Sequence, residues 1–244
     1  MTAPAVLHLL CAGAARGLVD ALQARFSAET GARIEGRFGA VGAMKEALAG
    51  GAPCDVMVVT DAMVSALAET GALDGSTRAP IGVVRTGVAV RAGDVDPALG
   101  TTDALRAALL GADRIYFPDP ARATAGIHFA SVLQRLGVAA TLAPRLATFP
   151  NGATAMAALA AAAERAPIGC TQITEILATP GVRLVDPLPP AFELATVYSA
   201  AVARQAADAS LAARFVELLT GAASRAARQA AGFELDPPVT SARG

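Results

Sequence analysis

The sequence predicts an α/β protein of two lobes, each a mostly parallel sheet flanked by helices, with a cleft between the lobes. Strand-like and helix-like runs alternate over almost all 244 residues, as parallel βαβ units require. Two segments, 80–85 and 190–196, interrupt the pattern and suit hinges. Two loops lead from a strand into a helix, at 38–44 and 119–129. We expect these loops to face each other across the cleft.

If the chain crosses between the lobes at both hinges, one lobe is discontinuous in sequence. It comprises residues 1–80 and 195–244, and the other lobe comprises residues 81–194. The discontinuous lobe is predicted to hold strands 5–10, 33–38, 55–60 and 196–202 and helices 17–30, 42–49, 61–70, 210–220 and 224–231. The inserted lobe is predicted to hold strands 80–91, 113–117, 145–149, 168–171 and 182–185 and helices 104–110, 126–136, 152–165 and 173–177.

The helix and strand assignments depend on periodicity and on end signals. Helix 17–30 carries apolar residues at helical spacing, and Gly31 follows it as a C-terminal signal. Segment 55–60 is a continuous apolar run typical of a strand that is buried on both faces. Thr101 is placed to cap the helix 104–110.

The composition excludes several classes of partner. The net charge is −1 and the chain has a single lysine, Lys45, so no basic face exists for a nucleic acid. Apolar runs fall short of the roughly 20 residues that span a bilayer, so we expect no membrane insertion. The cysteines Cys11, Cys54 and Cys170 are odd in number and lack CxxC spacing. We therefore expect no disulfide framework, no metal and no cofactor.

The N-terminal residues carry no basic stretch followed by an apolar segment and a cleavage site. As written, the sequence predicts a cytoplasmic protein. If a signal peptide preceded this sequence, the expectation changes to the periplasm.

Loops that open helices suit a small anion, because a helix start presents unpaired backbone N–H groups and the positive end of the helix dipole. Arg16 could clamp a carboxylate in bidentate fashion. His128, one of only two histidines, stands in the first turn of its helix as a donor or a base. The candidate ligand-binding residues are Ala14, Ala15, Arg16, Ala40, Val41, Arg122, Thr124, Ala125, Gly126, His128, Asn151, Gly152, Cys170 and Gln172.

Segments spread along the chain resemble the molybdate-binding protein family, which has the type II periplasmic solute-binding fold. The resemblance rests on their order and spacing over about residues 5–235. The segments are Cys11-Ala12-Gly13-Ala14-Ala15-Arg16-Gly17-Leu18, Phe26-Ser27-Ala28-Glu29-Thr30-Gly31-Ala32, Phe38-Gly39-Ala40-Val41-Gly42, Gly51-Ala52-Pro53-Cys54-Asp55-Val56, the Ala125-Gly126 turn and Phe233. It implies the binding of a small anion in the cleft and, if the chain is exported, an ABC transporter permease as partner.

The chain departs from that family where hydroxyl donors are expected. It has Ala14-Ala15-Arg16 in place of a serine in the first loop, and Val41 in place of a serine in the second turn. In the inserted lobe, the position where the family has a tyrosine corresponds roughly to Cys170. A desolvated dianion needs nearly every oxygen satisfied. We therefore expect an organic carboxylate or an oxyanion as the ligand, and favour a carboxylate over molybdate.

Two other functions stay open from the residues alone. A cytoplasmic isomerase, tautomerase or dehydratase of a small unsaturated acid would use His128, Glu175 and Cys170 as catalytic residues. An effector-binding domain would need a partner protein. No HExxH, GxSxG or P-loop motif favours an enzyme.

Overall fold

The computed structural model describes residues 5–235. The prediction of cellular location depends on residues 1–4, which lie outside the described part. The described strands are β1 (Val6–Ala12), β2 (Arg33–Gly39), β3 (Val56–Thr60), β4 (Ala79–Arg91), β5 (Arg114–Pro118), β6 (Leu146–Phe149), β7 (Pro167–Gln172), β8 (Val182–Pro187) and β9 (Ala195–Val202). The α-helices are α1 (Arg16–Thr30), α2 (Val41–Ala49), α3 (Asp61–Glu69), α4 (Thr102–Gly111), α5 (Thr124–Arg135), α6 (Ala139–Leu142), α7 (Gly152–Ala160), α8 (Ile173–Leu177), α9 (Ala209–Thr220) and α10 (Arg225–Ala230).

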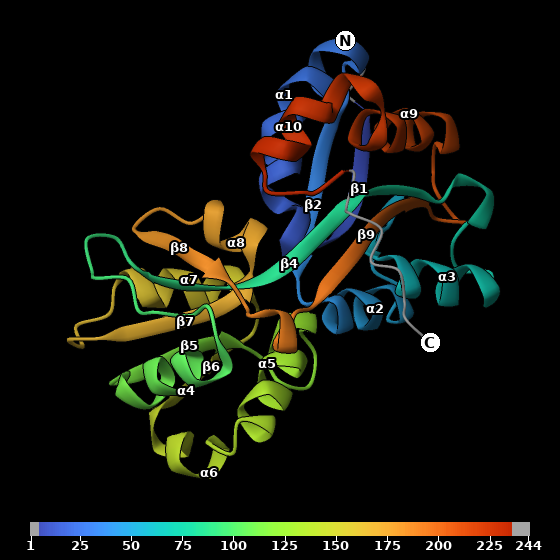
Figure 1. Ribbon diagram of the computed structural model, residues 1–244. Coiled ribbons are helices and arrows are strands. Elements are labelled where there is room, and N and C mark those ends of the chain that lie inside the picture. Colours follow the sequence, from blue (N-terminus) through green and yellow to red (C-terminus); the bar gives the residue numbers. More distant parts are fainter. Residues whose placement is uncertain (1–4, 236–244) are drawn as a thin grey trace.

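All strands belong to one curled sheet that runs through both lobes (Figure 1). Its strand order is β2-β1-β3-β9-β4-β7-β5-β6, and β8 pairs with β4 off this path. The pairs β1–β2, β1–β3, β5–β6 and β5–β7 are parallel. Every antiparallel pair of the described strands involves β4, which runs through both lobes, or its neighbour β9. The predicted fold class, two lobes of α/β structure, is confirmed.

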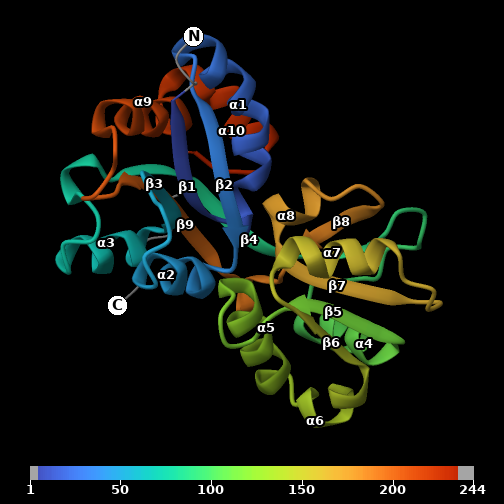
Figure 2. The ribbon, with the colours of Figure 1, turned by 180° about the vertical axis from the view of Figure 1, so that it is seen from behind.

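Strand β4 belongs to both lobes. Its first half, Ala79–Arg85, pairs with β9, and its second half, from Thr86, pairs with β7 and β8. The segment predicted as the first hinge is therefore a continuous strand. Figures 1 and 2 both show β4 passing from one lobe into the other, and β9 lies beside the first half of β4.

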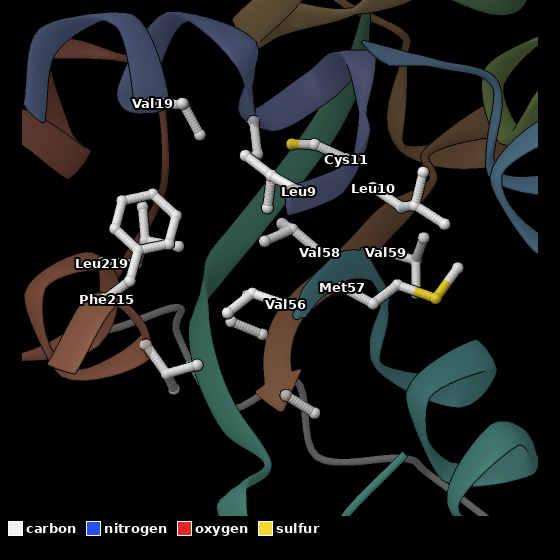
Figure 3. Close-up of a cluster of buried hydrophobic side chains, with 14 of the residues drawn as sticks. Leu9, Leu10, Cys11, Val19, Val56, Met57, Val58, Val59, Phe215 and Leu219 are labelled. Carbon is white, nitrogen blue, oxygen red and sulfur yellow. The ribbon is translucent and has the colours of Figure 1, made fainter. Parts of the chain in front are cut away.

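Each lobe has its own buried core. In the lobe that contains β1 and α10, alternate side chains of β1 and β3 point to opposite faces of the sheet. Figure 3 shows Leu9 and Val58 on the side of Phe215, and Met57 and Val59 on the other. All of these side chains are buried, which explains why segment 55–60 reads as a continuous apolar run.

The core of the inserted lobe is built around β5 and α5. Phe117 and Phe129 meet edge to face with ring centroids 5.3 Å apart. The two main cores change over between Val84 and Val88 and between Phe192 and Tyr198. The division at 80/81 and 194/195 stays a prediction. No helix within residues 5–235 has the length and apolarity of a bilayer span.

Candidate functional site

Small residues at four helix openings surround a cavity between the lobes. The lobe that contains β1 and α10 contributes the short helix η1 (Gly13–Ala15) and the start of α2, and the inserted lobe contributes the starts of α5 and α7. Figure 2 shows α2 and α5 meeting where the lobes approach each other. The residues that line the cavity are Ala12, Gly13, Ala14, Gly39, Ala40, Val41, Pro118, Ala123, Thr124, Ala125, Asn151, Gly152, Gln172, Glu175 and Tyr198. We refer to it as the interlobe cavity.

Three of these openings, those of η1, α2 and α5, lack a side-chain cap. Their N-cap residues are Ala12, Ala40 and Ala123, and none makes a side-chain hydrogen bond to its helix. The first N–H groups of an α-helix have no partner inside the helix. An anion in the cavity can therefore accept hydrogen bonds from one opening in each lobe.

Gly126 positions the α5 opening, although it does not line the cavity. A Cβ atom on Gly126 would lie 2.4 Å from the carbonyl oxygen of Pro118 and 2.3 Å from that of Asp119. Only glycine lets α5 begin this close to the end of β5. Its contribution is close packing of the helix start against the strand.

The α7 opening is already occupied by side chains of the protein. Asn151 caps α7 in a reciprocal box with Thr154, with 2.9 Å between Asn151 Oδ1 and the Thr154 backbone nitrogen. The backbone N–H groups of Gly152 and Ala153 donate to the carboxylate of Glu175. This opening is therefore satisfied without a ligand.

Glu175 is a buried carboxyl group, with only 6% of the residue exposed. Besides the two α7 donors, it accepts from the Gln172 backbone N–H and from the Thr171 hydroxyl at 2.6 Å. Burial raises the pKa of Glu175 above its ordinary value of 4.5, while these hydrogen bonds act in the opposite direction. Among residues 5–235, no arginine or lysine is paired with it.

A tyrosine hydroxyl supplies a donor that the sequence did not reveal. Tyr198 comes from β9 and is 2% exposed. Burial and the nearby Glu175 raise its pKa, so the phenol keeps its proton. Gln172 Nε2 donates to the Tyr198 oxygen at 3.2 Å, and the Thr124 hydroxyl also hydrogen-bonds to it. A phenol can accept through its oxygen and donate its proton, so Tyr198 can donate into the cavity when the Thr124 hydroxyl is the donor of their bond.

The interlobe cavity is small. The space open to the centre of a water molecule is about 20 Å³, whereas a single water needs about 10–15 Å³ on this measure. A ligand of a few non-hydrogen atoms fits, such as an inorganic oxyanion or a short carboxylate.

The structure brings most of the predicted site residues together and leaves some apart. Of the predicted residues, the cavity is lined by Ala14, Ala40, Val41, Thr124, Ala125, Asn151, Gly152, Gln172 and Glu175. It is not lined by Ala15, Arg16, Arg122, Gly126, His128 or Cys170. Ala15 is buried under the first opening. The lining residues that sequence reasoning missed are Ala12, Gly13, Gly39, Pro118, Ala123 and Tyr198.

The two arginines predicted to clamp the ligand have other partners. Arg16 is exposed, lies 3.5 Å from Asp20 and stacks over the ring of Phe38. Arg122 reaches across the mouth of the cleft to Glu46, with 2.7 Å between its Nη2 and Oε2. Its carbonyl oxygen accepts from the N–H of Gly42 at 3.1 Å. Arg122 therefore connects the lobes outside the cavity.

Two of the three predicted catalytic residues lie away from the cavity. His128 Nε2 is 2.7 Å from the carbonyl oxygen of Phe192. Cys170 is fully buried in the core of the inserted lobe, and burial raises the pKa of its thiol. Cys170 is therefore a core residue, and the cavity tyrosine, which we expected to be lost at about that position, is Tyr198 of β9. Among the described residues, no cluster of metal-ligating side chains occurs.

A family model described as bacterial extracellular solute-binding protein matches residues 7–234. The chain belongs to this family. No curated protein sequence matches it. Among solved structures, the periplasmic molybdate-binding protein of Azotobacter vinelandii is similar, with a TM-score of 0.77 and 22% identity over 94% of this chain and 99% of the other.

Two further structures that the solute-binding protein resembles show the same fold. The sulfate-binding protein SubI of Mycobacterium tuberculosis has a TM-score of 0.74 and 16% identity over 96% of this chain and 88% of the other. L-phospholactate-bound PEB3, a Campylobacter jejuni protein, has a TM-score of 0.66 and 15% identity over 93% and 99%. At these identities the likeness concerns the fold alone.

Proposed function

We propose that this solute-binding protein closes around one small anion in the interlobe cavity and presents it to the permease of an ABC importer. The observation that carries the proposal is the pair of uncapped helix openings, α2 and α5, one from each lobe. Tyr198 adds a neutral hydroxyl donor between them. Similar folds in the molybdate-binding and sulfate-binding proteins support the choice of an anion. A periplasmic location follows from this proposal.

The geometry supports binding better than turnover. Of the residues predicted to act as acid or base, only Glu175 reaches the cavity, and four donors already engage its carboxylate. The cavity also has no second titrating base, since its only other ionisable side chain is the phenol of Tyr198.

The test is calorimetry and thermal unfolding of the purified protein with a panel of small anions. The panel contains molybdate, tungstate, sulfate, perrhenate, nitrate, hydrogen carbonate, formate, acetate and glycolate. A ligand at a hundred times its Kd should add about 2.7 kcal/mol to the free energy of unfolding. If no anion of this size binds, the proposed function is wrong.

Tyrosine variants test whether binding occurs at the predicted place. The chain has two tyrosines, which gives a matched pair. Tyr198→Phe should weaken binding of the best anion by about tenfold, because one donor in a water-poor site is lost. Tyr116 bonds to Glu164 at 3.0 Å, away from the cavity, so Tyr116→Phe should leave affinity unchanged. Equal affinities of both variants would place the ligand elsewhere.

A further inference from the structure

The interlobe cavity offers an anion no cationic side chain. Its lining contains no arginine, lysine or histidine, and its only acidic residue is Glu175. Attraction must therefore come from backbone N–H groups, helix dipoles and hydroxyls, which carry partial charges. Against these stands one full carboxyl group that the protein itself contributes.

The carboxyl oxygens of Glu175 lie at the wall of the cavity. A Cβ atom on the lining residue Gly13 would lie 2.4 Å from Oε1, and one on Gly152 would lie 1.9 Å from Oε2. The two glycines, one from each lobe, thus leave the space that the carboxylate fills. A bound ligand and Glu175 share the same small space between the lobes, where water screens their charges less than in bulk solvent.

The donors around Glu175 determine how its charge is balanced. Its partners are the Thr171 hydroxyl and three backbone N–H groups, two of them from the α7 opening. The N–H groups of the α7 opening therefore donate to Glu175 and contribute few hydrogen bonds to a ligand. The remaining openings, those of η1, α2 and α5, must balance the charge of the ligand alone.

We propose that Glu175 sets the charge of the ligand, so that the cavity binds singly charged oxyanions in preference to tetrahedral dianions such as molybdate, tungstate and sulfate. The inference depends on the proposed function, since it assumes an anion in this cavity. At about 5 Å and an effective dielectric constant of about 20, one extra negative charge on the ligand weakens binding by about tenfold or more.

A second observation concerns hydrogen bonding rather than charge. Gln172 lines the cavity and is 2% exposed, yet its Oε1 has no hydrogen-bond partner among residues 5–235. Its Nε2 is engaged with Tyr198. An unsatisfied buried acceptor is costly, so a ligand that carries its own O–H group gains by pairing with it. We infer that the preferred monoanion carries a donor, as hydrogen carbonate and short 2-hydroxy acids do.

The charge inference is tested with perrhenate and tungstate, which are tetrahedral, nearly equal in size and different by one charge. In calorimetry at neutral pH, perrhenate should bind the wild-type protein at least about tenfold more tightly. Equal affinities, or tighter binding of tungstate, would overturn the inference and leave the proposed function intact. Failure of every anion in the panel would instead remove the proposed function.

Glu175→Gln removes the charge and keeps the shape. The variant should gain affinity for tungstate relative to perrhenate by about tenfold. Glu69→Gln makes the same change of net charge on an exposed part of α3 and should keep the wild-type ratio. An unchanged ratio in Glu175→Gln would contradict the role of this residue. If the variant does not fold, the wild-type comparison decides alone.

The donor inference is tested with hydrogen carbonate and nitrate, which are both planar and singly charged. Hydrogen carbonate should bind the wild-type protein about tenfold more tightly, and Gln172→Leu should abolish that preference. Gln134→Leu, an exposed change on α5, should preserve it. Equal affinities of the two anions for the wild-type protein would overturn this part and leave the charge inference standing.

Discussion

The α5 and α7 openings stand side by side in the wall of one cavity and differ in how they are satisfied. The α5 opening begins at Ala123, which offers no cap, while the α7 opening begins at Asn151 and is closed by Asn151 and Glu175. Both helices present N–H groups to the same space. The difference teaches that a helix start binds a ligand only where the protein leaves it unsatisfied, and that a satisfied start can shape the electrostatics of its neighbour.

The largest effect on this difference between the openings is expected from Gly152→Ala, which displaces the carboxyl group of Glu175 from its hydrogen-bonded position. The new Cβ atom would lie 1.9 Å from Glu175 Oε2 and 2.1 Å from Thr171 Oγ1, so the carboxyl group must move and lose donors. We expect a loss of about 2–4 kcal/mol in the free energy of unfolding, measured by denaturant titration, together with loss of anion binding.

The control for that change is Gly100→Ala. A Cβ atom on Gly100 would meet nothing within 4 Å. This variant should match the wild type within about 0.5 kcal/mol. Similar stabilities of the two variants would show that the close packing of Glu175 against Gly152 does not contribute to the free energy of unfolding.

The comparison can also be reversed by giving α5 a cap of its own. Ala123→Ser places a hydroxyl where the α5 opening is now bare. Because the serine competes with the ligand for the same N–H groups, anion affinity should fall about tenfold while stability rises by about 1 kcal/mol. Calorimetry and thermal unfolding measure the two effects. Ala121→Ser, in the exposed loop before α5, should change neither, and unchanged affinity in Ala123→Ser would contradict a ligand at this helix start.

A third prediction concerns the dependence of stability on pH in the ligand-free protein. The pKa of Glu175 is raised in the folded state, so the folded protein binds its proton more tightly than the unfolded chain does. The contribution to stability is fully present below the ordinary pKa of 4.5 and is lost as pH rises through the raised value. In wild-type protein the contribution of Glu175 to the free energy of unfolding should therefore decline as pH rises from its ordinary pKa of 4.5 through its raised pKa in the folded state.

In Glu175→Gln the free energy of unfolding should decline less with rising pH, because the variant lacks the buried carboxyl group of residue 175. Glu69→Gln serves as the control, because it removes an exposed carboxyl group on α3. Parallel pH profiles for wild type and Glu175→Gln would mean that the buried carboxyl does not change its proton affinity on folding. The measurement is urea unfolding at a series of pH values.

The smallest effect is expected at the mouth of the cleft. The Arg122–Glu46 pair joins the lobes, but both side chains are more than half exposed, with 52% and 57% accessible. Arg122→Ala should weaken all anions by the same factor, less than about fivefold, because the pair stabilises only the closed form. Calorimetry with two chemically different anions checks this. A larger effect on one anion would place Arg122 in contact with the ligand.

Much of the fold could be predicted because burial leaves a mark on the sequence. The run Val56–Thr60 and the glycine after α1 fix a strand and a helix end without help from distant residues. Helix α7 is shorter than predicted, ending at Ala160, because alanine continues the pattern after the helix has stopped. The direction in which β4 crosses between the lobes is a property of the whole sheet, and local pattern does not contain it.

The site was predicted where it depends on backbone and missed where it depends on side-chain direction. Ala40, Thr124 and Gly152 were found because helix starts have local signals. Tyr198 was missed because it lies in a strand whose inward face is set by the crossing of the sheet. Arg16 and Arg122 were expected at the ligand because a long charged side chain can extend in many directions. In the structure they form ion pairs with Asp20 and Glu46 instead.

The pairing of β9 with β3 has a consequence for how the chain is synthesised. Val56 pairs with Val202, so one lobe cannot complete its sheet until β9 has left the ribosome. The inserted lobe, whose strands lie mostly between Thr86 and Pro187, has all its partners available earlier. We expect the inserted lobe to acquire its structure first during translation, while β1, β2 and β3 wait with an exposed apolar edge for β9 to arrive.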